Sequence, residues 1–272
     1  MLSAKYDALR NRIKNLGSAL VAYSGGVDST LLTFATHAVL GDRCIAVLAS
    51  TDVAPSAETE AARATAAALN FRLHEVETYE LSDSRFCENT TERCYYCKSE
   101  MFGMLRAVAM SKGIKWVLDG SNADDTADHR PGMRAAREYG VVSPLLDVGL
   151  HKDEIRELSR QLGLPTWDKP SMACLASRFP YGTPITDAGL RRVSTAEDAV
   201  RALGIKQFRV RDHGDVARVE VDPAEMQQAW NVRDRVNSAV KSAGFTFVAQ
   251  DLEGYRSGRL NDALHVAEDS AE

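Results

Sequence analysis

The sequence contains no apolar run close to the roughly 20 residues that a membrane-spanning helix needs, so we expect no association with a membrane. It also has no excess of basic residues, since 33 Lys and Arg against 38 Asp and Glu give a formal net charge of -5. This balance argues against a general nucleic-acid-binding protein. Residues 1–17 have the pattern of an amphipathic helix and not that of a signal peptide. We therefore expect a cytoplasmic protein.

Cysteine is scarce. Five cysteines among 272 residues are an odd number in a chain long enough to bury its own core, which argues against a secreted disulfide scaffold. Cys94 and Cys97 form a C-x-x-C pair, a spacing that suits zinc, an iron–sulfur cluster or a redox disulfide. Two thiols are too few for a closed metal site. Cys44 and Cys87 are expected to be structural.

Apolar segments of strand length alternate with helical segments over the first part of the chain. The expected strands are residues 18–23, 44–50, 71–77 and 116–122. A polar, cysteine-bearing stretch runs through about residue 98 and is followed by an expected helix that ends at residue 112. This alternation predicts an α/β fold with a parallel, doubly wound sheet covered by helices on both faces. Ligands of such sheets bind beyond the carboxyl ends of the strands, where two glycine-containing turns should face one crevice.

The composition changes near residue 165, because four of the eight prolines lie within residues 165–184. Proline interrupts helices and strands, so this segment is expected to be a connecting loop. Beyond this loop, helices and short strands predict a smaller α+β domain. The expected elements there are a helix at 187–203, strands at 207–211 and 217–221, a helix at 223–243 and a strand at 245–252. The expected organisation is a nucleotide domain at 1–168, an active-site linker loop at 169–186, a small substrate or assembly domain at 187–258 and a flexible acidic tail at 259–272.

The most informative run is SGGVDS, which follows the first expected strand and precedes a helix. Its residues are Ser24, Gly25, Gly26, Val27, Asp28 and Ser29. Glycines let the backbone turn tightly, and the N–H groups and dipole of a helix N-terminus favour phosphate. The serine hydroxyls can add donors, and a carboxylate can hold Mg²⁺. The spacing is neither the Walker form nor the dinucleotide-binding G-x-G-x-x-G.

Two further runs carry chemistry. Residues 119–138 combine a small-residue turn with carboxylates and arginines, and their candidate ligand-binding residues are Gly120, Asn122, Asp125 and Arg134. A polar loop that caps the next helix is the structural alternative. In KPSMACLASRFPYG (169–182), Cys174 lies four residues before Arg178. A nearby cation lowers the pKa of a thiol, which a nucleophile or metal ligand needs.

On these motifs the chain resembles the N-type ATP pyrophosphatases, which cleave ATP between the α and β phosphates and adenylate a substrate oxygen. With RCYYCK (93–98) and FRVRDHGDVARVEV (208–221), it is most similar to the ATP-dependent sulfur transferases that build the nickel-pincer nucleotide cofactor of lactate racemase. The resemblance spans roughly residues 5–255. It implies that a carboxylate of a pyridinium biscarboxylic acid mononucleotide is adenylated and converted to a thiocarboxylate.

The resemblance also implies roles for individual residues. The SGGVDS loop, with Gly120, Asn122 and Asp125, would bind ATP, and Asp28 would help to hold Mg²⁺. Cys174 would attack the acyl adenylate and give up its sulfur, leaving dehydroalanine; alternatively, Cys94, Cys97 and Cys174 would hold a [4Fe–4S] cluster that carries sulfide. Glu197, Arg209 and Arg211 would face the substrate phosphate and a metal, whereas the residues alone suggest a solvated sheet face.

Three other functions stay open from the residues. An amide-forming ligase would need ammonia, and no glutaminase segment is present to supply it. A tRNA-thiolating enzyme usually appends an RNA-binding domain, which the net charge of -5 does not support. A nucleotide-binding module without chemistry would not require Asp28 and Cys174 together. The expected partner is a small-molecule nucleotide and not a nucleic acid, and the resemblance implies a homo-oligomer.

Overall fold

The computed structural model describes residues 2–127, 131–170, 173–256 and 258–262. The chain forms two compact units. The first unit comprises Met1–Glu80 and Glu92–Met172, and the second comprises Leu81–Thr91 and Ala173–Glu272.

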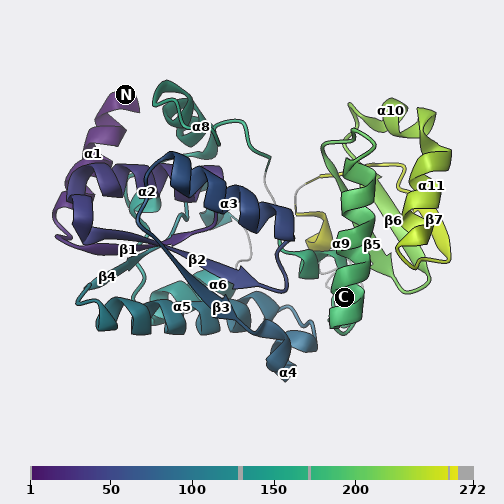
Figure 1. Cartoon of the computed structure of the whole chain (residues 1–272), viewed down its shortest axis with the longest axis horizontal. Coiled ribbons are helices and arrows are strands. Elements are labelled where there is room, and N and C mark those ends of the chain that lie inside the picture. The colour runs from purple at the N-terminus through teal and green to yellow at the C-terminus, as the bar shows by residue number, and fades with distance from the viewer. Residues whose placement is uncertain (1, 128–130, 171–172, 257, 263–272) are drawn as a thin grey trace, which may run out of the picture. The chain divides into compact units, whose positions relative to one another are not determined.

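The first unit is built on a parallel sheet, as predicted (Figure 1). Its strands are β1 (Ala19–Tyr23), β2 (Cys44–Thr51), β3 (Leu73–Thr78) and β4 (Trp116–Leu118). They are ordered β3-β2-β1-β4, and each neighbouring pair runs parallel. Because β1 and β4 are adjacent, the turns that follow them lie at the same edge of the sheet.

Helices cover both faces of this sheet (Figure 1). One face packs against α1 (Leu2–Lys14), α2 (Val27–Leu40), α3 (Ser56–Ala68), α7 (Pro144–Asp147) and α8 (Lys152–Gln161). The other face packs against α5 (Arg93–Ser111) and α6 (Pro131–Glu138). Successive side chains of β1 point to opposite faces, so that Val21 packs with Leu31 of α2 while Leu20 packs with Phe102 of α5. The core therefore has two layers, one on each side of the sheet.

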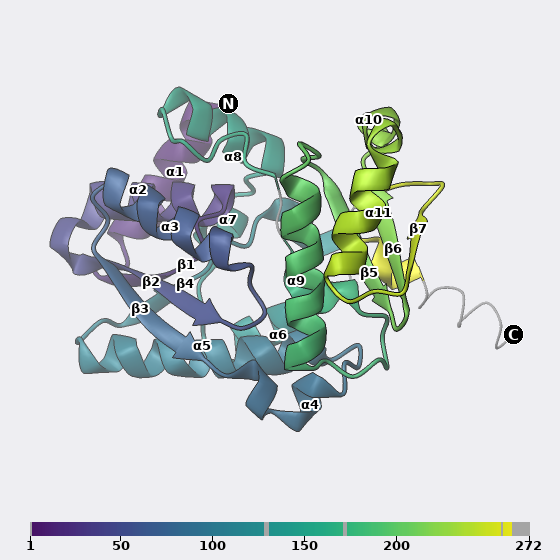
Figure 2. The ribbon, with the colours of Figure 1, turned by 45° about the vertical axis from the view of Figure 1, so that its right-hand side comes forward.

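The second unit is an α+β arrangement around a three-stranded mixed sheet (Figure 2). Its strands are β5 (Phe208–His213), β6 (Val216–Val221) and β7 (Phe247–Gln250), and its longer helices are α9 (Asp187–Arg201), α10 (Met226–Asn231) and α11 (Arg233–Ser242). β5 and β6 are antiparallel, and β6 and β7 are parallel. The single helix predicted at 223–243 is instead two helices separated at Val232.

Residues 81–91, which include α4 (Ser84–Cys87), belong to the second unit, although the sequence analysis placed them in the first domain. Hydrogen bonds explain this assignment. The side chain of Asn89 donates to the carbonyls of Pro180 and Thr183 at 2.8 Å each, and the backbone N–H of Ile185 donates to the carbonyl of Cys87 at 2.8 Å. Residues 171–172 of the predicted linker and 263–272 of the predicted tail lie outside the described residues.

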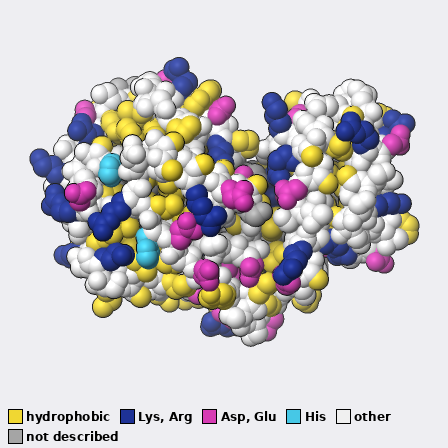
Figure 3. Space-filling view, viewed as in Figure 1, with side chains coloured by type: hydrophobic (Ala, Val, Ile, Leu, Met, Phe, Trp, Pro, Cys, Tyr) yellow, Lys and Arg dark blue, Asp and Glu magenta, His cyan; other side chains and the backbone are white. Residues whose placement is uncertain are grey.

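Basic and acidic side chains are interspersed over the surface that Figure 3 shows. Across the described ranges, every helix is too short or too polar to serve as a membrane span.

Candidate active site

The turn from β1 into α2 can accept only glycine at its first glycine position. Gly25 has φ +70°, and a Cβ added there would lie 2.5 Å from the Cβ of Ala62. Gly26 is the residue before α2 and offers no side chain to cap the helix. The loop therefore brings its backbone to the N-terminus of α2, where N–H groups and the helix dipole favour an anion.

The two serines of the loop hold its shape. Their hydroxyl oxygens lie 3.0 Å apart, and the oxygen of Ser29 accepts a hydrogen bond from the backbone N–H of Ser24 at 3.2 Å. The hydroxyl of Ser29 also lies 3.3 Å from the carbonyl of Gly26. These contacts close the loop on itself.

The loop after β4 packs against this turn, as the sequence analysis predicted from the two strand ends. A Cβ added to Gly120 would lie 3.2 Å from the backbone nitrogen of Ser29. The side chain of Asn122 donates to Asp28 at 3.3 Å, and its backbone N–H donates to Asp125 at 2.9 Å. The predicted residues Gly120, Asn122 and Asp125 are thus gathered with Asp28 at one edge of the sheet.

Two lysines reach the same loop, and the sequence analysis missed both. Lys152, the first residue of α8, forms an ion pair with Asp28. Lys169 donates to the carbonyl of Gly25 at 3.1 Å and pairs with Glu58 at 2.8 Å. One signal was available for Lys152: the dipole at a helix N-terminus disfavours a cation, so a lysine there suggests an acidic partner or ligand.

Asp124 ties the N-terminus of α8 to the loop that follows β4. Its carboxylate accepts from the backbone N–H of Lys152 at 2.7 Å and lies 2.7 Å from the Nδ1 of His151. Hydrogen bonding to His151, and then to the backbone of Lys152, lowers the pKa of Asp124. The loop that follows β4 therefore contacts the N-termini of both α2 and α8, and each of these helix ends carries partial positive charge.

In the second unit, Cys174 is exposed and precedes a short 3-10 turn, Leu175–Arg178. Arg178 contacts the backbone of Cys174: its Nη1 donates to the carbonyl of Cys174 at 3.0 Å and to that of Ala173 at 2.7 Å. The hydroxyl of Ser177 donates to the same Cys174 carbonyl at 2.7 Å. These bonds fix the backbone that carries the thiol.

Arg178 is itself buried in an ion pair. Its side chain is 0% exposed, and it donates to both carboxylate oxygens of Glu197 at 2.8 and 2.9 Å. Glu197 is 2% exposed and also accepts from the backbone N–H of Val210 at 3.1 Å. The contacts of Glu197 are thus those of a structural anchor. Its predicted role at a substrate phosphate or metal stays a prediction.

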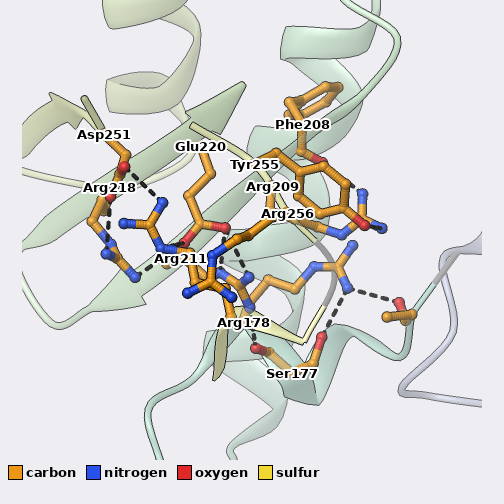
Figure 4. A network of polar contacts seen from close by, with 12 residues as sticks. Ser177, Arg178, Phe208, Arg209, Arg211, Arg218, Glu220, Asp251, Tyr255 and Arg256 are labelled. Carbon is orange, nitrogen blue, oxygen red and sulfur yellow. Dashed lines mark hydrogen bonds and ion pairs between the residues drawn. The ribbon is translucent and has the colours of Figure 1, made fainter. Parts of the chain in front are cut away.

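Arg209 and Arg211 lie near Arg178 in this unit (Figure 4). Arg209 is buried, donates to the hydroxyl of Tyr255 at 3.3 Å and lies over its ring at 4.6 Å. Burial, and then the positive charges of Arg178 and Arg211, lower the pKa of Arg209. Arg211 pairs with Glu220 at 2.7 Å and donates to the carbonyl of Ser177 at 2.7 Å. The predicted residues Arg209 and Arg211 therefore concentrate positive charge beside the backbone of the Cys174 segment.

The remaining predicted residues lie elsewhere in the first unit. Arg134 stacks on the ring of Tyr95 at 4.0 Å and pairs with Glu92, so its observed contacts are with the surface of α5 and α6. Cys94 and Cys97 lie in the first turns of α5, which begins at Arg93 and not after residue 98 as predicted. Cys94 is exposed, and Cys97 donates a hydrogen bond to Glu80 at 3.8 Å.

All five cysteines are described, and all are thiols. Burial raises the pKa of Cys44 to about 12, which fits the structural role predicted for it. Among the described residues, no three or more histidine, cysteine, aspartate or glutamate side chains form a group that could hold a metal ion.

The first strand of the parallel sheet leads through a glycine turn into a helix whose N-terminus favours an anion. A second loop, an aspartate and two lysines lie at that turn. These features define a nucleotide-binding α/β domain. The Asparagine synthase family model matches residues 3–170, and the chain belongs to this family of N-type ATP pyrophosphatases. It is an ATP-using enzyme family, which agrees with the prediction from the SGGVDS loop.

The chain is also similar to individual proteins over much of its length. The chain is 37% identical to pyridinium-3,5-bisthiocarboxylic acid mononucleotide synthase of Lactiplantibacillus plantarum, over 98% of this chain and 97% of that protein. It is 42% identical to the uncharacterized protein slr1717 of Synechocystis, over 97% of this chain and 99% of that protein. It is 26% identical to a glutamine-hydrolyzing GMP synthase chain of Archaeoglobus fulgidus, over 65% of this chain and 58% of that protein. The predicted resemblance to the nickel-pincer cofactor enzymes is confirmed.

Proposed function

We propose that this enzyme adenylates a carboxylate of a pyridinium carboxylic acid mononucleotide with ATP and then replaces the activated oxygen with sulfur, giving a thiocarboxylate. The observation that carries the proposal is the meeting of two loops and two lysines at the N-terminus of α2, where Asn122 and Lys152 contact Asp28 and Lys169 contacts the carbonyl of Gly25. The near-full-length similarity to a synthase of the bisthiocarboxylic acid mononucleotide supports this choice of substrate.

In the first unit the proposed task is to bind and cleave ATP. The loop Ser24–Ser29 and the N-terminus of α2 would bind the pyrophosphate, while Lys152 and Lys169 would balance its charge. The carboxylate of Asp28 already attracts a cation, the ammonium of Lys152, and its oxygens also suit Mg²⁺. Mg²⁺ held there would neutralise phosphate charge. A bare carboxylate is a poor electrophile, and adenylation gives it AMP as a leaving group.

In the second unit the proposed task is sulfur transfer. The thiolate of Cys174 would attack the acyl adenylate, forming a thioester and releasing AMP. Loss of the Cα proton of residue 174 and cleavage of its Cβ–S bond would then release the thiocarboxylate and leave dehydroalanine. Arg209 and Arg211 would bind the substrate phosphate, and Arg178, anchored by Glu197, would hold the backbone of Cys174 in place.

The alternative is a [4Fe–4S] cluster held by Cys94, Cys97 and Cys174. These three thiolates would supply three ligands and leave one iron open for sulfide. The cluster stays a prediction, and an absorption spectrum of anaerobically prepared protein tests it directly. We further propose that the enzyme acts in the cytoplasm on a small-molecule nucleotide and that it forms a homo-oligomer. Light scattering on the full chain tests the oligomeric state.

The test of the function is to incubate the enzyme with ATP, Mg²⁺ and pyridinium-3,5-biscarboxylic acid mononucleotide. Release of pyrophosphate is expected, and its absence would refute adenylation. Whole-protein mass should fall by about 34 Da as Cys174 becomes dehydroalanine, whereas repeated turnover at constant mass would refute the sacrificial step.

A matched variant separates the two units' tasks. Cys174→Ala should abolish thiocarboxylate formation and spare pyrophosphate release, because the thiol takes no part in cleaving ATP. If both are lost, the residue has a structural role.

A further inference from the structure

Arg156 of α8 is hydrogen-bonded to the segment that carries Lys169. Its two terminal nitrogens donate to two different backbone carbonyls, Nη1 to that of Trp167 and Nη2 to that of Lys169, at 2.8 Å each. A guanidinium is a rigid planar fork, so a side chain that holds both carbonyls fixes their positions relative to each other. Neither ATP cleavage nor sulfur transfer, as proposed above, assigns a task to Arg156.

The segment that Arg156 holds is short, and its start is buried. Leu164 is 1% exposed and belongs to the core that packs on α2, and Thr166 is 3% exposed. The backbone N–H of Lys169 donates to the carbonyl of Thr166 at 3.1 Å, which closes a turn. Pro170 follows and restricts Lys169 to an extended backbone. The core therefore holds one end of this turn, and Arg156 holds the other.

The side chain of Lys169 lies at the loop between β1 and α2. Its ammonium donates to the carbonyl of Gly25 at 3.1 Å and pairs with Glu58 of α3 at 2.8 Å, and the side chain is 19% exposed. Ala62, one turn later on α3, packs against Gly25. Lys169 thus joins this loop to α3, and the position of its ammonium depends on the backbone that Arg156 holds.

We propose that Arg156 is a positioning residue for ATP. It holds the backbone of residues 167–169 so that the ammonium of Lys169 lies at the turn where the β and γ phosphates bind, and it acts through Lys169 and not as a ligand of the nucleotide. This inference rests on the proposed function, because the phosphates are those of ATP. Lys152 reaches the same site from the N-terminus of α8. One helix would then supply both cations, one by its own side chain and one through the turn that it holds.

The first test follows Lys169 itself and needs no nucleotide. The full chain is treated with a limiting amount of an acetylating reagent, digested and mapped by mass, with exposed Lys112 as the internal reference. In Arg156→Ala, acetylation of Lys169 relative to Lys112 should rise by about threefold or more, because the ammonium is no longer held against Gly25 and Glu58. Circular dichroism checks that the variant is folded.

The second test compares two nucleotides on the full chain, by isothermal titration calorimetry with Mg²⁺. The analogue α,β-methylene-ATP cannot be cleaved between the α and β phosphates. Arg156→Ala should bind it about three to ten times more weakly than the wild type does, because Lys169 is displaced from the phosphates. AMP lacks the β and γ phosphates, so its affinity should stay within about twofold. A variant that merely folded poorly would lose affinity for both nucleotides.

Further variants separate positioning from direct binding. Lys169→Ala should weaken binding of the analogue by about tenfold or more. Adding Arg156→Ala to it should weaken binding by no more than about twofold further, because a residue that acts through Lys169 then has nothing to position. Arg156→Lys keeps the charge but not the fork, and it should recover only part of the lost affinity. Arg160→Ala is the matched control: it removes another arginine of α8, one that pairs with Glu157, and should match the wild type in both tests.

Three results would overturn the proposal. Unchanged acetylation of Lys169 in folded Arg156→Ala would show that Arg156 does not position it. Equal losses of affinity for the analogue and for AMP would show a general structural role. Additive losses in the double variant would show that Arg156 contacts the nucleotide directly. If the wild type binds no analogue, the proposed function fails and the phosphate role of Lys169 fails with it, whereas the acetylation ratio still decides whether Arg156 holds Lys169.

Discussion

The ion pair between Arg178 and Glu197 allows a quantitative prediction. In Glu197→Gln, the guanidinium of Arg178 stays fully buried but loses the carboxylate that pairs with it. Arg209 and Arg211 lie close enough for their charges to be felt, so the variant leaves three neighbouring cations with less compensation. Removing one partner of a buried pair costs about 3–5 kcal/mol. We expect the second unit to be destabilised by an amount in this range.

Hydrogen exchange resolved to peptides is the appropriate assay, because a chain with two units need not unfold in one step. The slowest amides of β5 should lose protection by about 150-fold to 5,000-fold, since 1.36 kcal/mol corresponds to a factor of ten. Glu157→Gln is the control, because Glu157 pairs with Arg160 on an exposed helix face, where ion pairs contribute little. If β5 keeps its protection within about threefold in Glu197→Gln, the argument from burial is wrong.

Three further predictions concern the first unit and the thiols. Lys152→Ala should slow pyrophosphate release by about a hundredfold with little loss of stability, and an unchanged rate would remove Lys152 from the phosphate site. Gly25→Ala should destabilise the first unit by more than about 1 kcal/mol and abolish ATP binding, because its Cβ would clash with Ala62; urea unfolding measures this against Gly17→Ala, which has a similar φ but open space around it. Cys44, with its pKa raised by burial to about 12, should resist iodoacetamide at pH 9 until the chain is unfolded, and alkylation of the native protein there would contradict its burial.

The periodicity of the sequence was enough to predict the sheet and the phosphate loop. The apolar runs at β1 and β2 are buried on both faces, so they read as strands without ambiguity, and the glycine turn after β1 has few other uses. The contact of Gly120 and Asn122 with Asp28 followed from one rule, that parallel strands end at the same edge.

Other features depend on contacts between segments far apart in the chain. Lys152 pairs with Asp28 across 124 positions, and Arg178 pairs with Glu197 of α9 across 19 positions. No local pattern shows which carboxylate a buried arginine will choose. The start of α5 was not predicted, because RCYYCK carries two thiols and two tyrosines in place of an apolar stripe. The first turn of α5 is instead held by hydrogen bonds from Cys97 to Glu80 and from Tyr95 to Glu138.

The excursion of residues 81–91 into the second unit has a consequence for how the protein can be divided. The chain passes between the units three times, near residues 80, 91 and 172. A fragment cut at residue 173 would lack Asn89, whose amide bridges two carbonyls of the Pro180–Thr183 turn. We therefore expect such a fragment to fold poorly. A gene fusion that carries only residues 173–272 as the second unit should fold poorly for the same reason. Neither unit is encoded by a continuous stretch, so no single cut separates the two.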